Sequence, residues 1–426
     1  PALAHNCQNT APRRSRRLHA STMASTAEAD AKACTQEEQE RKKLKPAYSI
    51  DDATSLLKKH FNVPATDVKE LDSYDDQNFK VESPYGTYVL KAHNGVEARN
   101  TELLDAQSQL LKHLEEHSIR APVEAQSRVS LKKTTLRLLR WVDGDVLSSS
   151  TMTPSLLERA GSFLGDIRKA LDGFDHRALH RLHLWDLRRF PAVATFSSKL
   201  RSMDCDVKRV KLVETCIENY ASQNFDNLPM ATLHGDFNDA NILLHDEQWG
   251  ILDVGDCVYS WRVNDVAIGA AYVMVNLCTS ENKRSGFSDK GDHVAVQGAQ
   301  KFVEGFLQRS TLSKDECRAL PHLIAARLAT SFTRVSRRPF RRLERGVVAS
   351  MAWWWCAVLR DAVDARRSQA RLVLLPRILS CPAGHASGTA GLPAPPRAAR
   401  GDGPRRVSRG DVVGRGLADD TYHKRP

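Results

Sequence analysis

The sequence predicts an α+β protein of two lobes: a small antiparallel sheet with one main helix, followed by a larger and mostly helical lobe. Short β-prone runs separated by turn residues occupy residues 68–142, and helical periodicity dominates residues 155–335. The turn pair Asp143-Gly144 marks the boundary between the two patterns. We therefore divide the chain into a disordered or targeting segment, an N-lobe, a C-lobe and a disordered tail, at residues 1–47, 48–143, 144–335 and 336–426.

The N-lobe is predicted to open with a short amphipathic helix. Ser49 is a suitable N-cap, Asp51 and Asp52 follow in the first turn, and apolar residues continue at helical spacing to Phe61. Strands are expected at residues 68–74, 78–82, 87–93, 123–129 and 134–142. Between the third and fourth of these strands, leucines at helical spacing without Gly or Pro predict one helix over residues 97–116.

The C-lobe is predicted to be helical with one interruption. Helical patterns lie at residues 155–171, 185–200, 207–222, 263–277, 293–307 and 314–335. In residues 232–256, two apolar strands at 242–244 and 250–252 flank the polar turn 245–248. The segment is therefore predicted to form a β-hairpin inside an otherwise helical lobe.

The formal net charge of +11 comes from the C-terminal part of the chain. Residues 334–426 contain 19 basic and 7 acidic residues, whereas the first 333 residues contain 43 basic and 44 acidic ones. Because the basic residues gather in a tail without a nucleic-acid-binding motif, the sequence argues against nucleic acid as a partner. No apolar run reaches the ~20 residues that a membrane-spanning helix needs, so no contact with a membrane is expected.

Cysteine usage and the N-terminal composition give two predictions of location. The nine cysteines are scattered and form no C-x-x-C pair, which favours a reducing compartment and hence the cytoplasm. The first 27 residues contain four arginines and no acidic residue before Glu28, which is typical of a mitochondrial or plastid transit peptide. An equally good explanation of this segment is that the sequence is a fragment from a gene model, since it begins with Pro1 and its first methionine is Met23.

The strongest chemical signal is the run His234-Gly235-Asp236, followed by Asn241 five residues after the aspartate and by Asp253 twelve residues further on. Phosphoryl transfer needs little covalent help from a protein, but it needs an oriented hydroxyl group and divalent metal on the phosphates. Asp236 is predicted to orient the acceptor hydroxyl and take its proton. Asn241 and Asp253 offer the hard oxygen ligands that Mg²⁺ prefers. The alternative is that these polar residues only cap a tight hairpin.

A kinase loop of this kind requires a lysine on an upstream strand and an acidic residue on the next helix to hold it. Lys91 lies in the third predicted strand, and Glu102 and Asp105 share one face of the helix that follows. Lys91 is predicted to bind the nucleotide phosphates, and Asp105 is favoured slightly over Glu102 as its partner. Taken alone, Lys91 would be a solvated lysine of an edge strand.

No Gly-rich phosphate loop precedes Lys91. Backbone amides of the first hairpin, together with the side chains of Ser73 and Asn78, are expected to hold the phosphates instead. Any β-turn favours residues of these types, so the same pattern also describes an ordinary hairpin.

Four segments of the chain resemble the aminoglycoside phosphotransferase and choline kinase superfamily, and within it the hydroxylysine kinase branch. They are SYDDQNF (73–79), YVLK (88–91), LHGDFNDANIL (233–243) and GILDVGD (250–256), within a similarity that runs from about residue 48 to residue 335. The resemblance implies a bilobal protein-kinase-like fold that phosphorylates the side-chain hydroxyl of free 5-hydroxy-L-lysine, with GTP (or ATP) as donor and Mg²⁺. It also implies that the nucleotide base meets the backbone of a hinge from Leu139 to Val142.

An acceptor with two ammonium groups needs carboxylates near Asp236, and Asp239 and Asp256 are the candidates. Asp239 would otherwise be a loop cap. Asp265 resembles an acid at a helix start that supports the loop, and it is expected to be structural. The predicted partners are thus a nucleotide and a small amine-bearing alcohol. Aminoglycoside-, choline- and homoserine-like acceptors stay open at this point, as does a nucleotide-binding pseudoenzyme.

Overall fold

The computed structural model describes residues 29–33, 35–181, 183, 185–195, 207–278 and 294–335. These residues all belong to the larger of two compact units, Pro1–Cys381, and the smaller unit is Pro382–Pro426. The predicted transit segment and the Arg-rich tail lie outside the described residues, as do residues 196–200 of the second predicted C-lobe helix. None of the described helices has the length and apolar character required to cross a bilayer.

The N-lobe is a five-stranded antiparallel sheet with the strand order β1-β2-β3-β5-β4. Its strands are β1 (Asp67–Leu71), β2 (Gln77–Ser83), β3 (Gly86–Ala92), β4 (Glu124–Ser130) and β5 (Thr135–Arg140). Lys91, on the central strand β3, lies opposite Asn78 of β2 and opposite Arg137 of β5. The predicted antiparallel sheet is confirmed, and its register places Lys91 on a strand that is paired on both sides rather than at an edge.

Helix α2 (Ile50–Leu56) begins where the sequence predicts. The Ser49 side chain accepts a hydrogen bond from the amide of Asp52, and the Asp52 carboxylate accepts one from the amide of Ser49. This reciprocal cap satisfies two amide donors that the first helical turn leaves without partners. The helix continues as a π-helical turn, η1 (Leu57–Phe61), and ends at Asn62, which has a φ of 52°.

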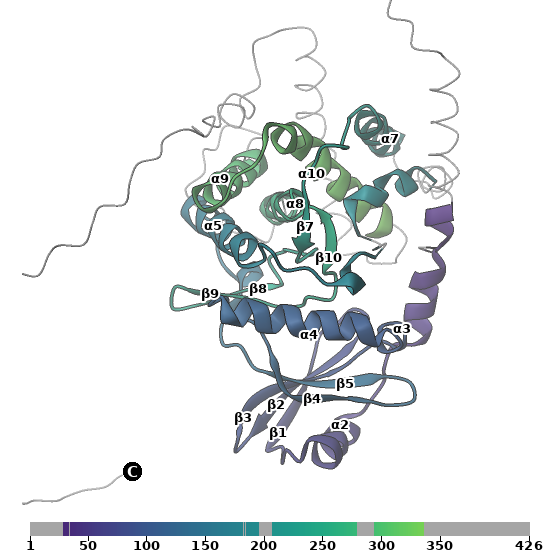
Figure 1. Cartoon of the computed structure of the whole chain (residues 1–426), viewed down its shortest axis with the longest axis vertical. Helices are drawn as coiled ribbons and strands as arrows, with labels where there is room; N and C mark the ends of the chain where they lie inside the picture. Colours follow the sequence, from purple (N-terminus) through teal and green to yellow (C-terminus); the bar gives the residue numbers. More distant parts are fainter. Residues whose placement is uncertain are drawn as a thin grey trace, which may run out of the picture. The chain divides into compact units, whose positions relative to one another are not determined.

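The helix predicted over residues 97–116 is two helices, α3 (Gly95–Ala98) and α4 (Thr101–Glu116). They are separated at Asn100, whose side chain accepts a hydrogen bond from the amide of Leu103 and so caps α4. The prediction of one continuous helix was wrong because the Asn side chain competes with the helix for backbone donors. Helix α4 lies between the sheet and the helices of the C-lobe (Figure 1).

The segment before α2, for which the sequence allows either disorder or a loose helix, is helical at residues 29–33 and 35–43. Contacts with both lobes order this charged segment. Towards its end, Lys45 donates hydrogen bonds of 2.7 and 3.0 Å to two carbonyl groups of the β1–β2 loop. Near its start, Asp30 forms a 3.0 Å ion pair with Arg189 of the C-lobe. We call the described residues from 29 to 45 the N-terminal brace.

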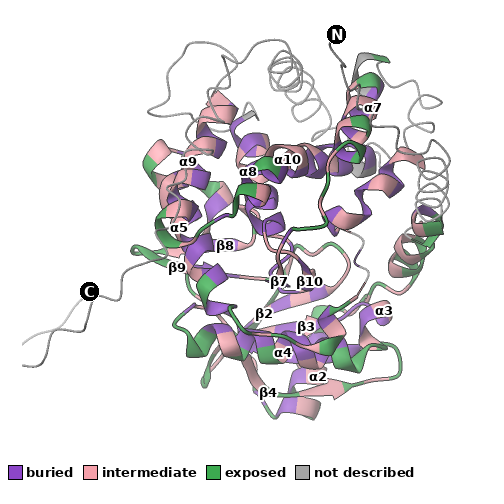
Figure 2. Cartoon of the chain, turned by 45° about the horizontal axis from the view of Figure 1, so that its top comes forward, coloured by how far each residue is buried: buried purple, intermediate pink, exposed green. Residues whose placement is uncertain are grey.

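The C-lobe is built around α8. Its long helices are α5 (Pro154–Ala170), α7 (Val207–Ala221), α8 (Asn264–Cys278), α9 (Val294–Arg309) and α10 (Lys314–Val335), which confirms five of the predicted helical segments. Helix α8 packs against α5, α9 and α10, and buried residues gather where these helices face one another (Figure 2). In the described part of the segment predicted as a helix at 185–200, residues Leu187–Val193 form a 3-10 helix, η4, which contains Pro191. Proline removes an amide donor, and this disfavours a continuous α-helix.

Short strands interrupt the helices of the C-lobe. Strand β7 (Met230–Leu233) pairs with β10 (Val258–Trp261), while β8 (Ile242–His245) pairs with β9 (Gln248–Ile251) and with β6 (Asp145–Val146). The hairpin of β8 and β9 confirms the predicted one. Because these two strands are antiparallel, the residues just before β8 lie beside the residues just after β9.

The close packing of α5 on α9 gives a first testable prediction. A Cβ atom at Gly161 of α5 would lie 1.8 Å from the carbonyl oxygen of Phe302 on α9, so the two backbones touch directly. We expect Gly161→Ala to lower the free energy of unfolding by about 1–3 kcal/mol, because overpacking outweighs the better helix propensity of alanine. Thermal or urea unfolding measures the change. Lys169→Ala, at an exposed site of the same helix, is the control, and equal stability of the two variants would contradict the prediction.

Candidate active site

The turn after β7 is held by α8. The amides of His234 and Gly235 each donate a hydrogen bond of 2.9 Å to the carboxylate of Asp265, in the first turn of α8. Gly235 has a φ of 86°, and a Cβ atom there would lie 2.2 Å from the carbonyl oxygen of Asp256, so a glycine is required. Asp265 thus makes the supporting contacts that the sequence suggests, and the turn presents Asp236 as its next residue.

One further contact joins this turn to the β8–β9 hairpin, and two more bonds fix the turn and the hairpin themselves. His234 Nε2 donates to the carbonyl of Leu252 at 2.8 Å, while His234 Nδ1 accepts from the amide of Asp236 at 3.3 Å. The Leu252 amide in turn donates to the carbonyl of Asn241 at 2.8 Å. These bonds place Asn241 beside the residue that precedes Asp253, so the structure brings together Asp236, Asn241 and Asp253 as the sequence predicts.

The Asp236 carboxylate is surrounded by donors. Its Oδ2 accepts from Asn238 Nδ2 at 2.8 Å and from Asn241 Nδ2 at 3.1 Å, and its Oδ1 accepts from Arg327 Nη2 at 2.8 Å. Burial raises the pKa of Asp236 to about 6; the positive charge of Arg327 opposes the rise and the negative charge of Asp256 adds to it. The group is therefore an ionised carboxylate at neutral pH, and it lies closer to its protonation point than an ordinary aspartate.

Asn241 and Asp253 offer oxygen atoms suited to a divalent cation. The Asn241 amide nitrogen donates to Asp236, which leaves the side-chain oxygen available. Asp253 has a φ of 52°, and its Oδ1 accepts from the amide of Gly255 at 3.1 Å. Its side chain is 53% exposed and open to a ligand. One neutral and one anionic oxygen ligand fit Mg²⁺, which completes its octahedron with water and phosphate oxygens.

Lys91 connects the N-lobe sheet to this hairpin. Its Nζ lies 2.8 Å from Asp76 Oδ2 and 3.5 Å from Asp253 Oδ1. Burial alone would lower the pKa of Lys91, but the charges of Asp253 and Asp76 raise it above its ordinary value. Lys91 is therefore a fixed positive charge next to the predicted metal ligand, which is the position that a phosphate-binding lysine requires.

The structure does not bring Lys91 to either of the acids predicted on the helix. Asp105 pairs with Arg128 and Glu102 pairs with Arg177. The acid that holds Lys91 is Asp76, in the loop between β1 and β2. The register of β2 on β3 explains this arrangement: Asn78 lies opposite Lys91, so the residues just before β2 reach the end of the lysine side chain.

A buried acidic residue that the sequence reasoning missed lies behind Asp76. Glu97, in α3, accepts from His93 Nδ1 at 3.1 Å and pairs with Arg41 of the N-terminal brace at 3.4 Å. Burial would raise the pKa of Glu97, but the hydrogen bond from His93 and the charges of Arg41 and Lys91 lower it. The only feature of the sequence that could have pointed to Glu97 is its position six residues after Lys91. It falls at the start of the helix predicted over residues 97–116, and the sequence predicts no role for it.

Ser73 and Asn78, the predicted phosphate-binding side chains, lie at the two ends of the β1–β2 loop. The Ser73 hydroxyl donates to the carbonyl of Asp76 at 2.8 Å and so closes the loop. Asn78 lies opposite Lys91, and its Oδ1 is buried without a hydrogen-bond partner in the described part of the chain. Asn78 is thus placed beside the lysine, whereas the Ser73 side chain shapes the loop.

The hinge residues implied for the nucleotide base lie where the chain leaves the sheet. Leu139 is a buried residue of β5, and Val142 follows the end of that strand. Between them, the amide of Arg140 donates to the carbonyl of Val123 and the amide of Trp141 donates to that of Thr87. The backbone at the end of β5 is thus bonded on both sides, to Val123 just before β4 and to Thr87 of β3, and it forms the link from the N-lobe to the C-lobe.

Of the two carboxylates predicted to bind the acceptor, Asp256 is the one whose negative charge helps to raise the pKa of Asp236. His183 Nε2 lies 3.2 Å from Asp256 Oδ1, and Arg181 donates to the neighbouring carbonyls of Gly255 and Cys257. Burial would raise the pKa of Asp256, but His183 and the two arginines Arg327 and Arg181 lower it. Asp256 is therefore a permanent negative charge of the site.

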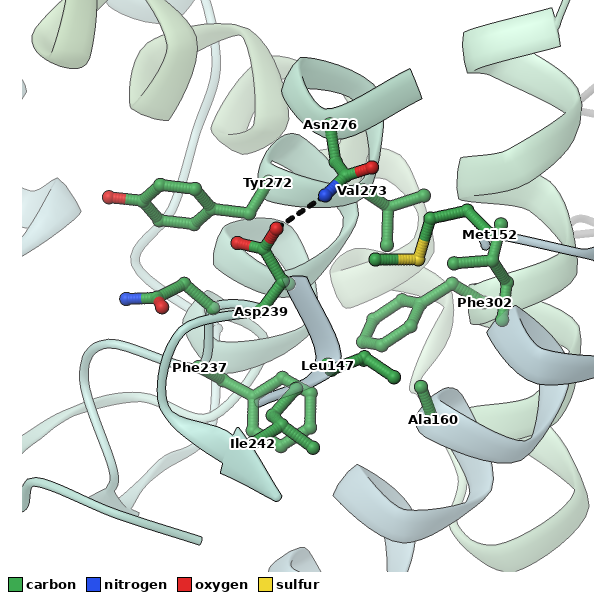
Figure 3. Close-up of a pocket in the computed structure, with 13 residues that line it drawn as sticks. Leu147, Met152, Ala160, Phe237, Asp239, Ile242, Tyr272, Val273, Asn276 and Phe302 are labelled. Carbon is green, nitrogen blue, oxygen red and sulfur yellow. Dashed lines mark hydrogen bonds between the residues drawn. The ribbon is translucent and has the colours of Figure 1, made fainter. Parts of the chain in front are cut away.

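Asp239 lies in a different environment. Its carboxylate accepts a hydrogen bond from the Asn276 side chain and borders a pocket with a mostly apolar lining (Figure 3). The lining includes Leu147, Met152, Phe237, Ile242 and Phe302. Burial raises the pKa of Asp239, and the bond from Asn276 opposes the rise. The two predicted acceptor-binding residues thus differ, with Asp256 among cations and Asp239 among apolar side chains.

Comparisons with known proteins agree with this geometry. The model of the phosphotransferase enzyme family matches residues 67–293. A hydroxylysine kinase of Danio rerio is 29% identical over 261 residues, which cover 55% of this chain and 72% of the relative. That of Xenopus laevis is 29% identical over 266 residues, with 54% and 71% covered. The solved structure of amicoumacin kinase hAmiN in complex with AMP-PNP, Ca²⁺ and Ami has a TM-score of 0.55 at 15% identity, covering 72% of this chain and 93% of that one. The likeness confirms the predicted two-lobed, kinase-like fold.

Proposed function

The chain belongs to the phosphotransferase enzyme family, and from that premise we propose that it transfers the γ-phosphate of GTP or ATP to the side-chain hydroxyl of 5-hydroxy-L-lysine. Two hydroxylysine kinases resemble it over more than two thirds of their own length, which supports this acceptor. The products are 5-phosphohydroxylysine and the nucleoside diphosphate, GDP or ADP, that leaves as the γ-phosphate is transferred. The coarser conclusion, that the chain is a small-molecule kinase, follows from the family itself.

One observation carries the proposed mechanism: Lys91 contacts Asp253, Asn241 contacts Asp236, and the backbone hydrogen bond from Leu252 to Asn241 brings the two pairs together. Lys91 Nζ lies 3.5 Å from Asp253 Oδ1, and Asn241 Nδ2 lies 3.1 Å from Asp236 Oδ2. In the proposed reaction Asp236 accepts the proton of the acceptor hydroxyl as its oxygen attacks the γ-phosphate. Lys91 binds the phosphates, and Asn78 lies beside it for a further polar contact. Mg²⁺ held by Asn241 and Asp253 would neutralise charge on the phosphates.

The acceptor side of the proposal rests on charge. Hydroxylysine carries two ammonium groups, and Asp256 offers an ionised carboxylate whose charge reaches Asp236. Asp239 offers a second carboxylate beside apolar side chains that suit a methylene chain. We assign Asp256 and Asp239 to binding of the acceptor amines, and the hinge from Leu139 to Val142 to the nucleotide base.

The test is a phosphate-transfer assay with Mg²⁺, in which GTP and ATP are offered separately with 5-hydroxylysine, lysine, choline and homoserine. Turnover of hydroxylysine but not of lysine supports the proposal, since lysine lacks only the hydroxyl group. If the protein phosphorylates choline or homoserine in preference to hydroxylysine, the kinase reaction stands and the proposed acceptor changes to that amino alcohol. Nucleotide binding without turnover of any acceptor would contradict the kinase reaction and favour a pseudoenzyme.

The pKa of Asp236 predicts the pH dependence of the reaction. Only the ionised carboxylate can take the hydroxyl proton, and its pKa is raised from 3.8 to about 6. We therefore expect kcat/KM for the acceptor to be constant above about pH 7 and to fall roughly tenfold per pH unit below about pH 6. The measurement is a pH profile from 4.5 to 8.5 at saturating nucleotide. A profile that stays flat down to about pH 4.5 would contradict the role of Asp236.

A further inference from the structure

A buried arginine lies against the acid of the proposed mechanism. The side chain of Arg327, on α10, is 2% exposed, and its Nη2 donates to Asp236 Oδ1 at 2.8 Å and to the Tyr272 hydroxyl at 3.1 Å. Burying a guanidinium group is costly unless its donors are satisfied by partners of suitable charge. The sequence motifs did not point to this residue, because it lies 91 positions after Asp236 in the chain.

The guanidinium group of Arg327 has donors that are not satisfied by the protein. Within the described residues, its Nε is buried without a hydrogen-bond partner. Its Nη1 contacts the carbonyl oxygen of Trp185 at 3.5 Å, which is the long limit of a hydrogen bond. Guanidinium N–H groups form strong hydrogen bonds with anionic oxygens, so a carboxylate oxygen suits the unused Nε donor.

Two aromatic rings fix the position of this group. The Arg327 guanidinium carbon lies 4.9 Å from the ring centre of Trp185 and 5.2 Å from that of Tyr272. Stacking against aromatic faces stabilises a planar cation and restricts its orientation. The arginine is therefore held in place before any ligand arrives, and the entropy lost on binding is reduced.

The charges around Asp236 restrict the acceptor. Asp236 and Asp256 favour the amines of an acceptor, whereas Arg327 repels an acceptor that carries positive charge alone. An acceptor that also carries a carboxylate converts this repulsion into an ion pair. The arrangement is thus unfavourable for choline-like alcohols and favourable for hydroxylated amino acids.

We propose that Arg327 binds the carboxylate group of the acceptor and thereby selects amino acids over amines that lack the acid group. The inference rests on the proposed function, since it concerns the acceptor of the same site. It goes beyond that function by assigning a third charged residue to acceptor recognition and by restricting the class of acceptor.

The first experiment compares kcat/KM for 5-hydroxylysine with that for its decarboxylated analogue, which keeps both amines and the hydroxyl group. We expect the unmodified protein to prefer the amino acid by about 10- to 100-fold. Arg327→Gln is expected to bring the ratio close to one, and Arg327→Lys to give an intermediate ratio because it keeps the charge but loses the Nε donor. Arg318→Gln, at an exposed position of the same helix, is the matched control and keeps the original ratio.

The ratio of the two kcat/KM values distinguishes recognition of the carboxylate from an indirect effect of the substitution on Asp236. Both acceptors react at Asp236, so a disturbance of Asp236 lowers both values of kcat/KM and leaves their ratio unchanged. A ratio that survives in Arg327→Gln would overturn the inference while leaving the hydroxylysine reaction intact. Retained nucleotide binding shows that each variant is folded.

A second experiment does not depend on turnover. Calorimetry in the presence of a non-hydrolysable nucleotide compares the binding of L-lysine with that of cadaverine. Cadaverine is lysine without its carboxylate, and neither ligand has a hydroxyl group that could be phosphorylated. Tighter binding of lysine that is lost in Arg327→Gln supports the inference even if hydroxylysine proves not to be the acceptor. Equal binding of both ligands to the unmodified protein would overturn it.

Discussion

Asp236→Asn is expected to lower kcat by about 10²- to 10⁴-fold while leaving the Kd for nucleotide nearly unchanged. Asparagine keeps the shape of the side chain and the acceptor oxygen that faces Arg327, but its amide cannot take a proton from the acceptor hydroxyl. The loss should appear in kcat rather than in the KM for nucleotide, because the removed proton transfer occurs only in the transition state.

Steady-state kinetics with titration of a fluorescent nucleotide measures both quantities for Asp236→Asn. The control is Asp226→Asn, which makes the same chemical change at an exposed position before β7. Melting of the variant must also be recorded, since Arg327 keeps its charge while losing an anionic partner. A variant that retains more than about half of the original kcat would exclude Asp236 as the proton acceptor.

Asp253→Asn is expected to lower kcat/KM by about 10²- to 10⁴-fold, because the anionic ligand of the proposed Mg²⁺ site is replaced by a neutral one. A metal ion on the phosphates contributes several kcal/mol to the transition state, and about 1.4 kcal/mol corresponds to a factor of ten. Lys91 loses a charged neighbour at 3.5 Å in the same variant. Part of the activity should return as the Mg²⁺ concentration is increased, since the weakened site is then filled by mass action.

Asp246→Asn provides a closely matched control for Asp253→Asn. Asp246 lies in the β8–β9 turn, and its φ of 44° resembles the 52° of Asp253. Both side chains are exposed, and asparagine tolerates this backbone conformation. A kinetic difference between the two variants therefore reports on the carboxylate and not on backbone strain. Equal activity of both variants at low Mg²⁺ would contradict the metal-binding role.

Local patterns were sufficient to predict most of the fold. Short β-prone runs between turn residues located all five strands of the N-lobe sheet, and the cap of α2 was visible in Ser49. The spacing of Asp236, Asn241 and Asp253 also carried enough information, because a hairpin of fixed length brings these three residues together. Short-range geometry depends on few torsion angles, so residue types predict it well.

Contacts between distant segments could not be read from the same patterns. Asp76 was predicted only as a turn residue, because its contact with Lys91 depends on the register of two strands. Arg327 lies on a helix with no motif, and its contact with Asp236 depends on how α10 packs against α8. The break at Asn100 followed from a competition between side-chain capping and helix propensity whose outcome the sequence leaves open.

The N-terminal brace ties the two lobes together at a distance from the covalent link after β5. One end holds the β1–β2 loop through Lys45, and the other holds the C-lobe through Asp30 and Arg189. The same loop carries Asp76, which holds Lys91. A movement that draws Lys91 away from Asp253 therefore also strains the contacts at the ends of the brace, and the brace resists that movement.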